Sequence, residues 1–150
     1  MKAVLQRVSS AQVIVAEKKV ASIQNGVLVL LGVAHEDTLE DAAWLSRKIA
    51  KLRIFDDADT VMNTSLLATK GDVIVVSQFT LQASTKKGNR PSYIQAAHPA
   101  IAKPLYEQFV NQLSVILEKK VQTGVFGAHM EVSLVNDGPV TIVLDSKNKI

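Results

Sequence analysis

Polar side chains that could take part in catalysis follow one another in the motif Ser77-Gln78-Phe79-Thr80, directly after the aliphatic run 73–76. Such a run is typical of a buried strand. We expect the strand to continue through the motif, which places these hydroxyl and amide groups at its carboxyl end. Alternation along a strand would put the side chains of Ser77 and Phe79 on one face and those of the other two residues on the opposite face. The motif indicates a site for a polar substrate group, although an amphipathic strand end without any chemistry has the same pattern.

A turn of unusual composition, Asn136-Asp137-Gly138-Pro139, separates two apolar, β-branched runs near the end of the chain. Proline has no N–H to donate and favours extended geometry in the residue before it. The turn is therefore a stiff corner with bare carbonyl oxygens and no side chain at Gly138. If the Gly138–Pro139 bond were cis, neighbouring carbonyl groups would point the same way. A trans bond that merely ends a strand is commoner, because only about 5–6% of X–Pro bonds in folded proteins are cis. The turn alone leaves both arrangements open.

The charges of the chain are unevenly distributed, although its net charge is only +3. No acidic residue occurs in the segment 73–106, and this segment contains Lys86, Lys87 and Arg90. An acid-free basic segment suits an anionic partner such as a phosphate backbone. A solvated loop that carries three cations is equally common, so the charges alone do not decide.

Several kinds of chemistry have no residues to support them. The chain has no cysteine, and its three histidines are scattered without an HxH or HExxH pattern, so we expect no metal site. There is no GxGxxG loop, Walker loop or GxSxG motif, and we expect no bound cofactor. An enzyme with this sequence would depend on backbone donors, hydroxyl groups or groups of its own substrate. No apolar run approaches the ~20 residues that cross a bilayer and no secretory signal is present, which favours the cytoplasm and no membrane partner.

The apolar periodicity predicts one domain over the whole chain of 150 residues. We expect a helix over 37–51, opened by Asp37 and Glu40 as a capping box, and a second helix over 99–120. The segment 62–70 has no clear period and is expected to be a loop. Strands are expected over 3–8, 11–16, 20–23, 27–33, 53–55, 72–81 and the two apolar runs within 132–144.

Two segments together, 76–81 and 135–141, closely resemble the paired signatures of the D-aminoacyl-tRNA deacylases. Further agreement extends over nearly the whole chain, in the segments 5–8, 30–33, 53–55, 62–63, 90–92 and 123–126. The resemblance implies an α+β fold in which two main helices pack on a barrel-like, mostly antiparallel sheet. It also implies a homodimer with the active site at the subunit interface and aminoacyl-tRNA as the partner.

The resemblance also implies roles for particular residues. The floor of the pocket would be formed by Ser77, Gln78, Phe79 and Thr80. To these we add candidate contacts to phosphates of the acceptor stem, which are Lys86, Lys87 and Arg90.

A second set of implied roles concerns the corner and the end of the tRNA. Gly138 and Pro139, joined by a cis bond, would enter the pocket of the partner subunit as a chiral gate. Arg7 would brace this corner. Phe126 and Met130 would lie around the terminal adenosine.

The implied reaction is hydrolysis of the ester that joins a D-amino acid to the 3′ end of tRNA. The developing oxyanion needs donors, and backbone N–H groups near Phe79 and Thr80 are the expected source. Thr80 is a candidate nucleophile, but no base is visible to activate it. We therefore favour a positioning role for Thr80, with the terminal 2′-hydroxyl of the tRNA assisting water, as the resemblance suggests.

Sparing L-aminoacyl-tRNA by about 10⁴-fold requires roughly 5.5 kcal/mol. A fitted apolar pocket discriminates a methylene by only about 1–3 kcal/mol, which favours a rigid clash with main chain. Glycyl-tRNA would pass such a gate and is a possible secondary substrate. On the residues alone, two other classes stay open: a non-catalytic RNA-binding module and an unrelated small-molecule hydrolase. Aromatic residues make up only 5% of the chain, which disfavours a stacking platform of the first class.

Overall fold

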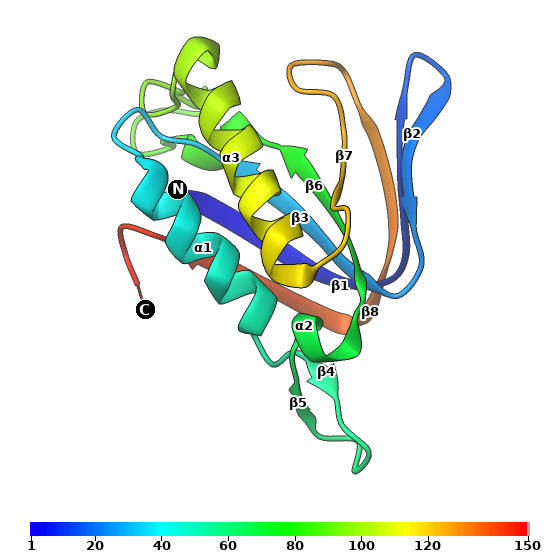
Figure 1. Ribbon diagram of the computed structural model, residues 1–150. Helices are drawn as coiled ribbons and strands as arrows, with labels where there is room; N and C mark the ends of the chain where they lie inside the picture. The colour runs from blue at the N-terminus through cyan, green and yellow to red at the C-terminus, as the bar shows by residue number, and fades with distance from the viewer. Residues whose placement is uncertain (150) are drawn as a thin grey trace.

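A six-stranded sheet forms the centre of the structure, a computed structural model that describes residues 1–149 (Figure 1). Its strands are β1 (Lys2–Val15), β2 (Lys18–Ile23), β3 (Gly26–Gly32), β6 (Asp72–Ser77), β7 (Gln122–Thr123) and β8 (Glu131–Asp145). Their order is β2-β1-β3-β6-β7, and β8 also pairs with β1. β1 is antiparallel to β2, β3 and β8, whereas the β3–β6 and β6–β7 pairings are parallel. The sheet curls into a nearly closed barrel, so the expected barrel-like α+β fold is confirmed, with one parallel portion.

Two long helices cover one face of the sheet, as expected (Figure 1). They are α1 (Leu39–Lys51) and α3 (Pro99–Leu117), which pack against each other. The short α2 (Leu66–Thr69) precedes β6, and the 3₁₀ helix η1 (Phe79–Gln82) follows it. A separate two-stranded hairpin, β4 (Phe55–Asp56) and β5 (Met62–Thr64), projects beyond the end of the sheet.

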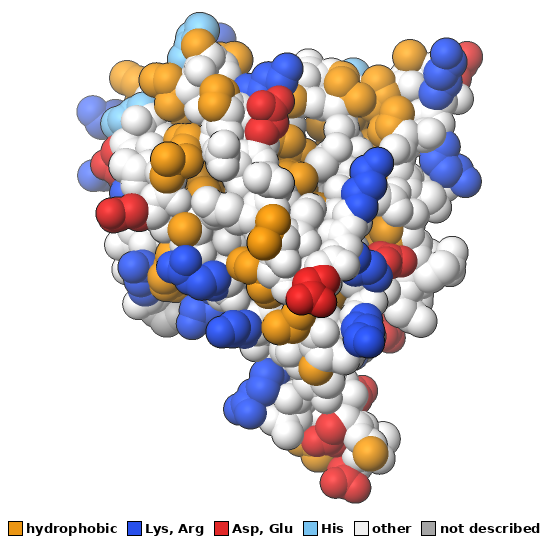
Figure 2. Space-filling view, in the orientation of Figure 1, with side chains coloured by type: hydrophobic (Ala, Val, Ile, Leu, Met, Phe, Trp, Pro, Cys, Tyr) orange, Lys and Arg blue, Asp and Glu red, His pale blue; other side chains and the backbone are white. Residues whose placement is uncertain are grey.

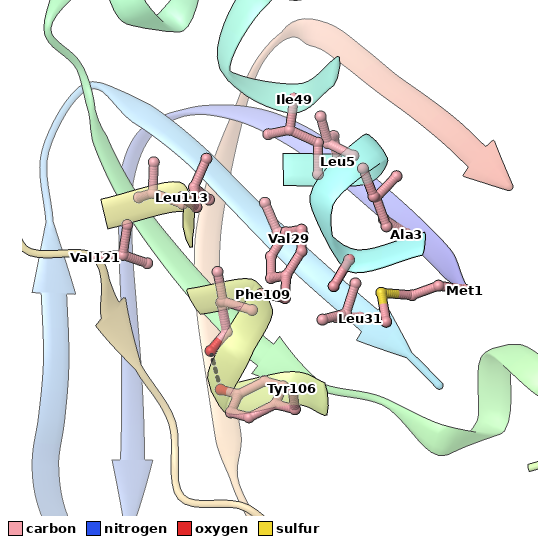
Figure 3. Packing of buried hydrophobic residues seen from close by; sticks show 14 of the residues in the cluster. Met1, Ala3, Leu5, Val29, Leu31, Ile49, Tyr106, Phe109, Leu113 and Val121 are labelled. Atoms are coloured by element: carbon pink, nitrogen blue, oxygen red, sulfur yellow. Dashed lines mark hydrogen bonds between the residues drawn. The ribbon is translucent and has the colours of Figure 1, made fainter. Parts of the chain in front are cut away.

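The strand β3 is apolar along its whole length because both of its faces are covered. Val29 and Leu31 point toward the helices and pack with Phe109 and Leu113 of α3 (Figure 3). Leu28 belongs to a second buried cluster, which it forms with residues of β1, β2 and β6. Burying such side chains contributes about 1.5–3 kcal/mol each, so the two clusters hold the carboxyl ends of β3 and β6 in place.

The first helix begins at Leu39, two residues after the expected start at Asp37. Thr38 is the N-cap, and its side chain accepts from the N–H of Glu40, while the Thr38 N–H donates to the Asp41 carboxylate at 2.8 Å. The capping box is therefore Thr38 with Asp41, and the expected pair of Asp37 and Glu40 is wrong. Asp37 is buried, and its carboxylate accepts from the N–H of Ala34 at 2.7 Å. This carboxylate is therefore directed toward Ala34 and does not cap the helix.

Three other boundaries differ from the expectations. β1 runs unbroken from Lys2 to Val15, because pairing with β8 continues past the two serines that were expected to interrupt it. The segment 62–70 is not a plain loop: it contains β5, and it contains α2, which Ser65 caps by accepting from the Ala68 N–H. The helix α3 ends at Leu117, because Glu118 adopts the left-handed conformation with φ of 52°. Within the described residues, no helix is both long and apolar enough to cross a membrane.

Candidate active site

A cavity of about 540 Å³ opens at the carboxyl ends of β3 and β6. Its lining is mostly apolar, and the residues that matter for chemistry are Ser77, Gln78, Phe79, Tyr106, Phe126 and Met130. Five of these six were expected at the site from the sequence. A pocket of this size falls in the range of about 300–1,000 Å³ that accepts small organic groups.

The polar motif does not continue the strand. β6 ends at Ser77, and Phe79 begins the 3₁₀ helix η1, so the expected alternation of side chains between two faces is wrong. Two hydrogen bonds fix the turn. The Gln78 N–H donates to the Leu31 carbonyl at 2.8 Å, and the Leu81 N–H donates to the Gln78 carbonyl. The turn leaves Phe79 57% exposed at the cavity. It also presents the first N–H groups of η1, which have no partner within a helix.

Thr80 lies beside the cavity and is held by its neighbour. The side-chain amide of Gln78 donates to the Thr80 hydroxyl. A hydroxyl that accepts this bond keeps its own hydrogen free to donate. The two residues therefore form one polar unit at the edge of the pocket.

The turn is anchored to β3 by a buried glutamine that sequence reasoning missed. Gln82 is buried, and its amide donates to the Gly32 carbonyl at 2.8 Å. Gly32 allows close contact, since an added Cβ would lie 2.8 Å from the Gln78 carbonyl oxygen and 2.9 Å from the Leu81 Cβ. The only signal in the sequence was a glutamine two residues after the polar motif 77–80, and such a glutamine usually lies on the surface.

An aromatic pair forms another wall. Tyr106 donates its hydroxyl to the Val75 carbonyl at 2.8 Å, as the dashed line in Figure 3 marks. Burial, together with the nearby charge of Glu107, raises the pKa of Tyr106 well above its usual range, so the phenol stays neutral. The Phe126 ring lies 5.6 Å from the Tyr106 ring between centroids. Tyr106 was missed because its helical spacing with Phe109 and Leu113 also fits an ordinary core position.

The Gly138–Pro139 peptide bond is cis, and the corner lies inside a single strand, not between two. Both halves of β8 pair with β1: Thr141 lies opposite Gln6 and Asn136 opposite Val8. Residues 137–140 therefore form a large bulge that faces only Arg7 across the ladder.

Side chains hold this bulge from two directions. Arg7 donates from Nε to the Asp137 carbonyl at 2.9 Å and from Nη1 to the Ile54 carbonyl at 2.8 Å. Asn136 accepts from the Val140 N–H at 2.8 Å and donates to the Thr141 hydroxyl. The bulge is thus fixed at its base while Gly138 and Pro139 at its tip remain exposed.

The corner and the cavity lie at opposite ends of the barrel. Arg7 pairs with Val27 at the start of β3, whereas the cavity begins at Leu31. Four strand residues span about 13 Å, and in Figure 1 the bend of β8 lies at the lower end while the turn after β6 lies at the upper end. Within one chain, Arg7, Gly138 and Pro139 do not join the other expected site residues.

The basic segment forms a loop that leads away from the cavity rim. The Ser84–Ser92 bridge closes the base of this loop. The residues between the two serines include Lys86, Lys87 and Arg90, which are exposed to solvent. Tyr93 follows and packs edge-on against Phe79, with ring centroids 5.0 Å apart. This aromatic contact joins the end of the basic loop to Phe79, which lines the cavity.

The histidines do not form a metal centre. Within residues 1–149, no three His, Cys, Asp or Glu side chains are grouped closely enough to hold a metal ion. His98 caps α3 by accepting from the Ala100 N–H, and His129 lines the cavity. His129 is a third residue of this region that sequence reasoning missed, after Gln82 and Tyr106.

Comparison with known proteins identifies this architecture. A model of the family described as D-Tyr-tRNA(Tyr) deacylase matches residues 4–145. The chain is 62% identical to the D-aminoacyl-tRNA deacylase of Flavobacterium psychrophilum and 57% identical to that of Bacteroides fragilis, in both cases over 99% of each chain.

Solved structures agree with this similarity. The c-Myc DNA Unwinding Element Binding Protein is 40% identical, with a TM-score of 0.91 over 97% of this chain and 98% of that one. A probable eukaryotic D-amino acid tRNA deacylase shares the fold, with a TM-score of 0.84 at 18% identity over 95% of this chain and 97% of that one. The chain belongs to the D-Tyr-tRNA(Tyr) deacylase family.

Proposed function

We propose that the chain hydrolyses the ester bond of D-aminoacyl-tRNA and releases a free D-amino acid and tRNA. The observation that carries this proposal is the cavity of about 540 Å³ at which Ser77, Gln78 and Phe79 meet Phe126 and Met130. Relatives named D-aminoacyl-tRNA deacylase match the chain over its full length. The cavity is suited to a small acyl group and the terminal nucleoside that carries it.

In the proposed mechanism, a water oxygen attacks the ester carbonyl carbon. The N–H groups at the start of η1, from Phe79 and Thr80, donate to the oxygen that becomes negative. The bond to the ribose oxygen then breaks, this oxygen takes up a proton, and the amino acid leaves as its carboxylic acid. The neighbouring 2′-hydroxyl of the tRNA assists the water.

Thr80 has a positioning role in this scheme. Among the hydrogen bonds of residues 1–149, its hydroxyl is paired only with the Gln78 amide, which is a donor and not a base. A nucleophilic threonine needs a base to remove its proton. The hydroxyl can instead donate to the substrate or to the attacking water.

Rejection of L-aminoacyl-tRNA is assigned to the corner of a second copy of the chain. Within one chain, Gly138 and Pro139 are exposed and far from the cavity. Arg7 holds the main chain beside them, so the corner is a wall without a side chain that can move aside. A rejection of about 10⁴-fold, worth roughly 5.5 kcal/mol, is within reach of such a steric clash. Glycyl-tRNA, whose amino acid has no side chain, would pass the same gate.

This arrangement implies a homodimer with two sites, each made from the cavity of one subunit and the corner of its partner. Lys86, Lys87 and Arg90, on the loop that leads away from the cavity rim, would contact phosphates near the acceptor end. A tRNA substrate also implies that the protein acts in the cytoplasm, where translation takes place.

One experiment tests the activity and its stereochemistry together. The protein is mixed with D-tyrosyl-tRNA and with L-tyrosyl-tRNA, and the free amino acid is measured over time. We expect release from the D-ester only. Equal release from both esters would contradict the gate, and release from neither would contradict the hydrolase. Full activity at dilutions at which sedimentation shows only monomer would contradict the shared site.

A second candidate function is nucleic-acid binding without catalysis. It is favoured by the 40% identity to a protein named for binding a DNA unwinding element. The same assay separates the two: this candidate predicts tRNA binding in a gel-shift experiment with no release of amino acid.

A further inference from the structure

A basic hollow lies on the surface of the structure, away from the cavity. Its lining combines four cationic residues with two apolar ones, which are Arg47, Lys48, Lys51, Arg53, Trp44 and Leu52. We call this set the α1 hollow. Its volume is about 430 Å³, and it shares no residue with the cavity. Figure 2 shows Lys and Arg side chains gathered in the region of the C-terminal half of α1.

The cations of the α1 hollow are exposed and are not neutralised. None of the four takes part in an ion pair among the described residues. No acidic residue occurs between Asp41 and Asp56 in the sequence. Arg47 and Lys51 are four residues apart on one helix, a spacing at which like charges repel each other. The patch therefore carries a local electrostatic cost that an anionic partner would remove.

The helix dipole explains only part of this arrangement. Lys48 and Lys51 lie in the last turn of α1, where cations are favourable. Arg53 lies beyond the end of the helix and does not belong to that turn. The dipole also does not explain why the cations surround a hollow.

Trp44 gives the hollow an aromatic floor. The Lys48 ammonium lies 5.6 Å from the centre of the ring, and the Lys149 ammonium lies 4.9 Å from it. Lys149 thereby adds a fifth cation from the end of the chain. Five cations around one surface are more than a single small anion needs, whereas they match a row of phosphates in a nucleic-acid backbone.

We propose that the α1 hollow binds the phosphate backbone of the tRNA body while the 3′ end of the same molecule occupies the cavity. This inference rests on the proposed function, because it takes the substrate to be tRNA. The contacts are sequence-independent, since cations on phosphates fix position without reading bases. The α1 hollow then contributes to affinity for the whole tRNA and not to the chemical step.

The test compares two double variants with the wild-type chain. Lys48→Gln with Lys51→Gln removes two cations of the hollow. Lys18→Gln with Lys19→Gln removes two exposed cations from the start of β2 and is the matched control. Binding of uncharged tRNA is measured over a salt series, with the fluorescence of Trp44, the only tryptophan, as a local readout.

We expect the hollow variant to bind tRNA more weakly and its log K against log[salt] slope to become shallower by about 2. In the wild-type chain, tRNA binding should change the Trp44 fluorescence. KM for D-tyrosyl-tRNA should rise several-fold in the hollow variant while kcat stays unchanged. Hydrolysis of D-tyrosyl-adenosine, which has no tRNA body, should proceed at the wild-type rate. The control variant should keep the wild-type slope and KM.

Two results would overturn the inference, and each differs from a failure of the proposed function. One is an unchanged tRNA affinity and salt slope in the hollow variant. The other is an equal loss in the control variant, which would indicate a general effect of net charge. Failure of the wild-type chain to hydrolyse either D-ester would instead overturn the proposed function, and with it the identity of the RNA as a substrate.

Discussion

Arg7 and Asp137 are joined by a hydrogen bond of 2.9 Å from the guanidinium Nε to the main-chain oxygen. The same guanidinium donates to the Ile54 carbonyl at 2.8 Å, so one side chain of β1 ties the corner in β8 to the segment before β4. Arg7 is only 8% exposed. Its charge is therefore satisfied by main-chain oxygens and by Asp56, and the corner depends on it.

Replacing Arg7 by lysine should lower both stability and activity. A lysine ammonium is a compact point charge and cannot reproduce the planar fork that reaches two carbonyls at once. Losing one charged hydrogen bond in a buried site should cost about 2 kcal/mol in the free energy of unfolding. Urea unfolding measures the first effect and deacylation of D-tyrosyl-tRNA the second. Arg53→Lys, at an exposed position, is the stability control, and an equal loss there would contradict this account.

Replacing Gly138 by alanine should abolish deacylation while the chain stays folded. Gly138 has φ of 136°, and an added Cβ would lie 2.9 Å from Val140 Cγ2 and 3.3 Å from Arg7 Nη2. The corner must therefore shift, and the proposed gate loses its shape. Gly88 also has a positive φ, but an added Cβ there meets nothing within 4 Å. Gly88→Ala thus gives the stability cost of positive φ alone, about 1–2 kcal/mol. Wild-type turnover in folded Gly138→Ala would leave the gate without support.

Replacing Thr80 by alanine should slow deacylation without eliminating it. The hydroxyl is positioned by the Gln78 amide, and backbone donors at the start of η1 remain when it is lost. Removing one catalytic donor typically costs about 10²–10³ in kcat. Thr80→Ser, which keeps the hydroxyl, should restore most of the rate. Complete loss in the alanine variant, with tRNA binding retained, would favour a nucleophilic role.

The sequence was sufficient to predict the long strands of the sheet, the two main helices and part of the lining of the cavity. The apolar runs of β3 and β6 and the helical period of α3 are strong signals because both faces of the strands and one face of the helix are buried. Ser77, Gln78 and Phe79 were expected at a strand end and do lie at the cavity. The path of the chain through them was not predictable, since the turn into η1 depends on the Leu31 carbonyl from a distant part of the sequence.

Other features depend on tertiary contacts that no local pattern encodes. Gln82 is buried only because Gly32 leaves room beside it. Tyr106 has the spacing of a core residue, and only the direction of its hydroxyl toward Val75 distinguishes it. The corner looked like a turn between two strands, but both halves of β8 find the same partner, β1. Pairing across the sheet overrode the local turn signal there.

Stability should depend on Asp41 in a pH-dependent manner. Burial raises the pKa of Asp41, but hydrogen bonds from Lys147, Ser146 and the Thr38 N–H outweigh it and hold this pKa well below its usual range. A carboxyl with a lowered folded-state pKa stabilises the fold above its unfolded value of about 3.9, and this contribution is lost as the pH falls toward the folded-state pKa.

Asp41→Asn should therefore unfold at lower urea than the wild-type chain at pH 7. The difference between the two should shrink as the pH falls below about 4. Urea unfolding at a series of pH values measures it. A difference that stays constant with pH would show that the carboxylate charge is not what stabilises the N-terminus of α1.

Two inactive variants should restore activity when mixed, if each site takes its cavity from one subunit and its corner from the other. Gly138→Ala disables the corner and leaves the cavity intact. Ala128→Trp fills the cavity, which Ala128 lines, and leaves the corner intact. A mixed dimer then contains one site with both parts intact and one site with neither.

Random exchange of equal amounts of the two chains should recover about a quarter of the wild-type deacylation rate, because half of the dimers are mixed and one of their two sites works. Each variant alone is one control. The other control is a mixture that is assayed before the dimers have had time to exchange subunits. A corner that served the cavity of its own chain would give no recovery, since no chain in the mixture carries both intact parts. Arg7 pairs with Val27, whereas the cavity begins at Leu31, and this separation along β3 supports a site shared between subunits, so recovery of activity is the expected outcome.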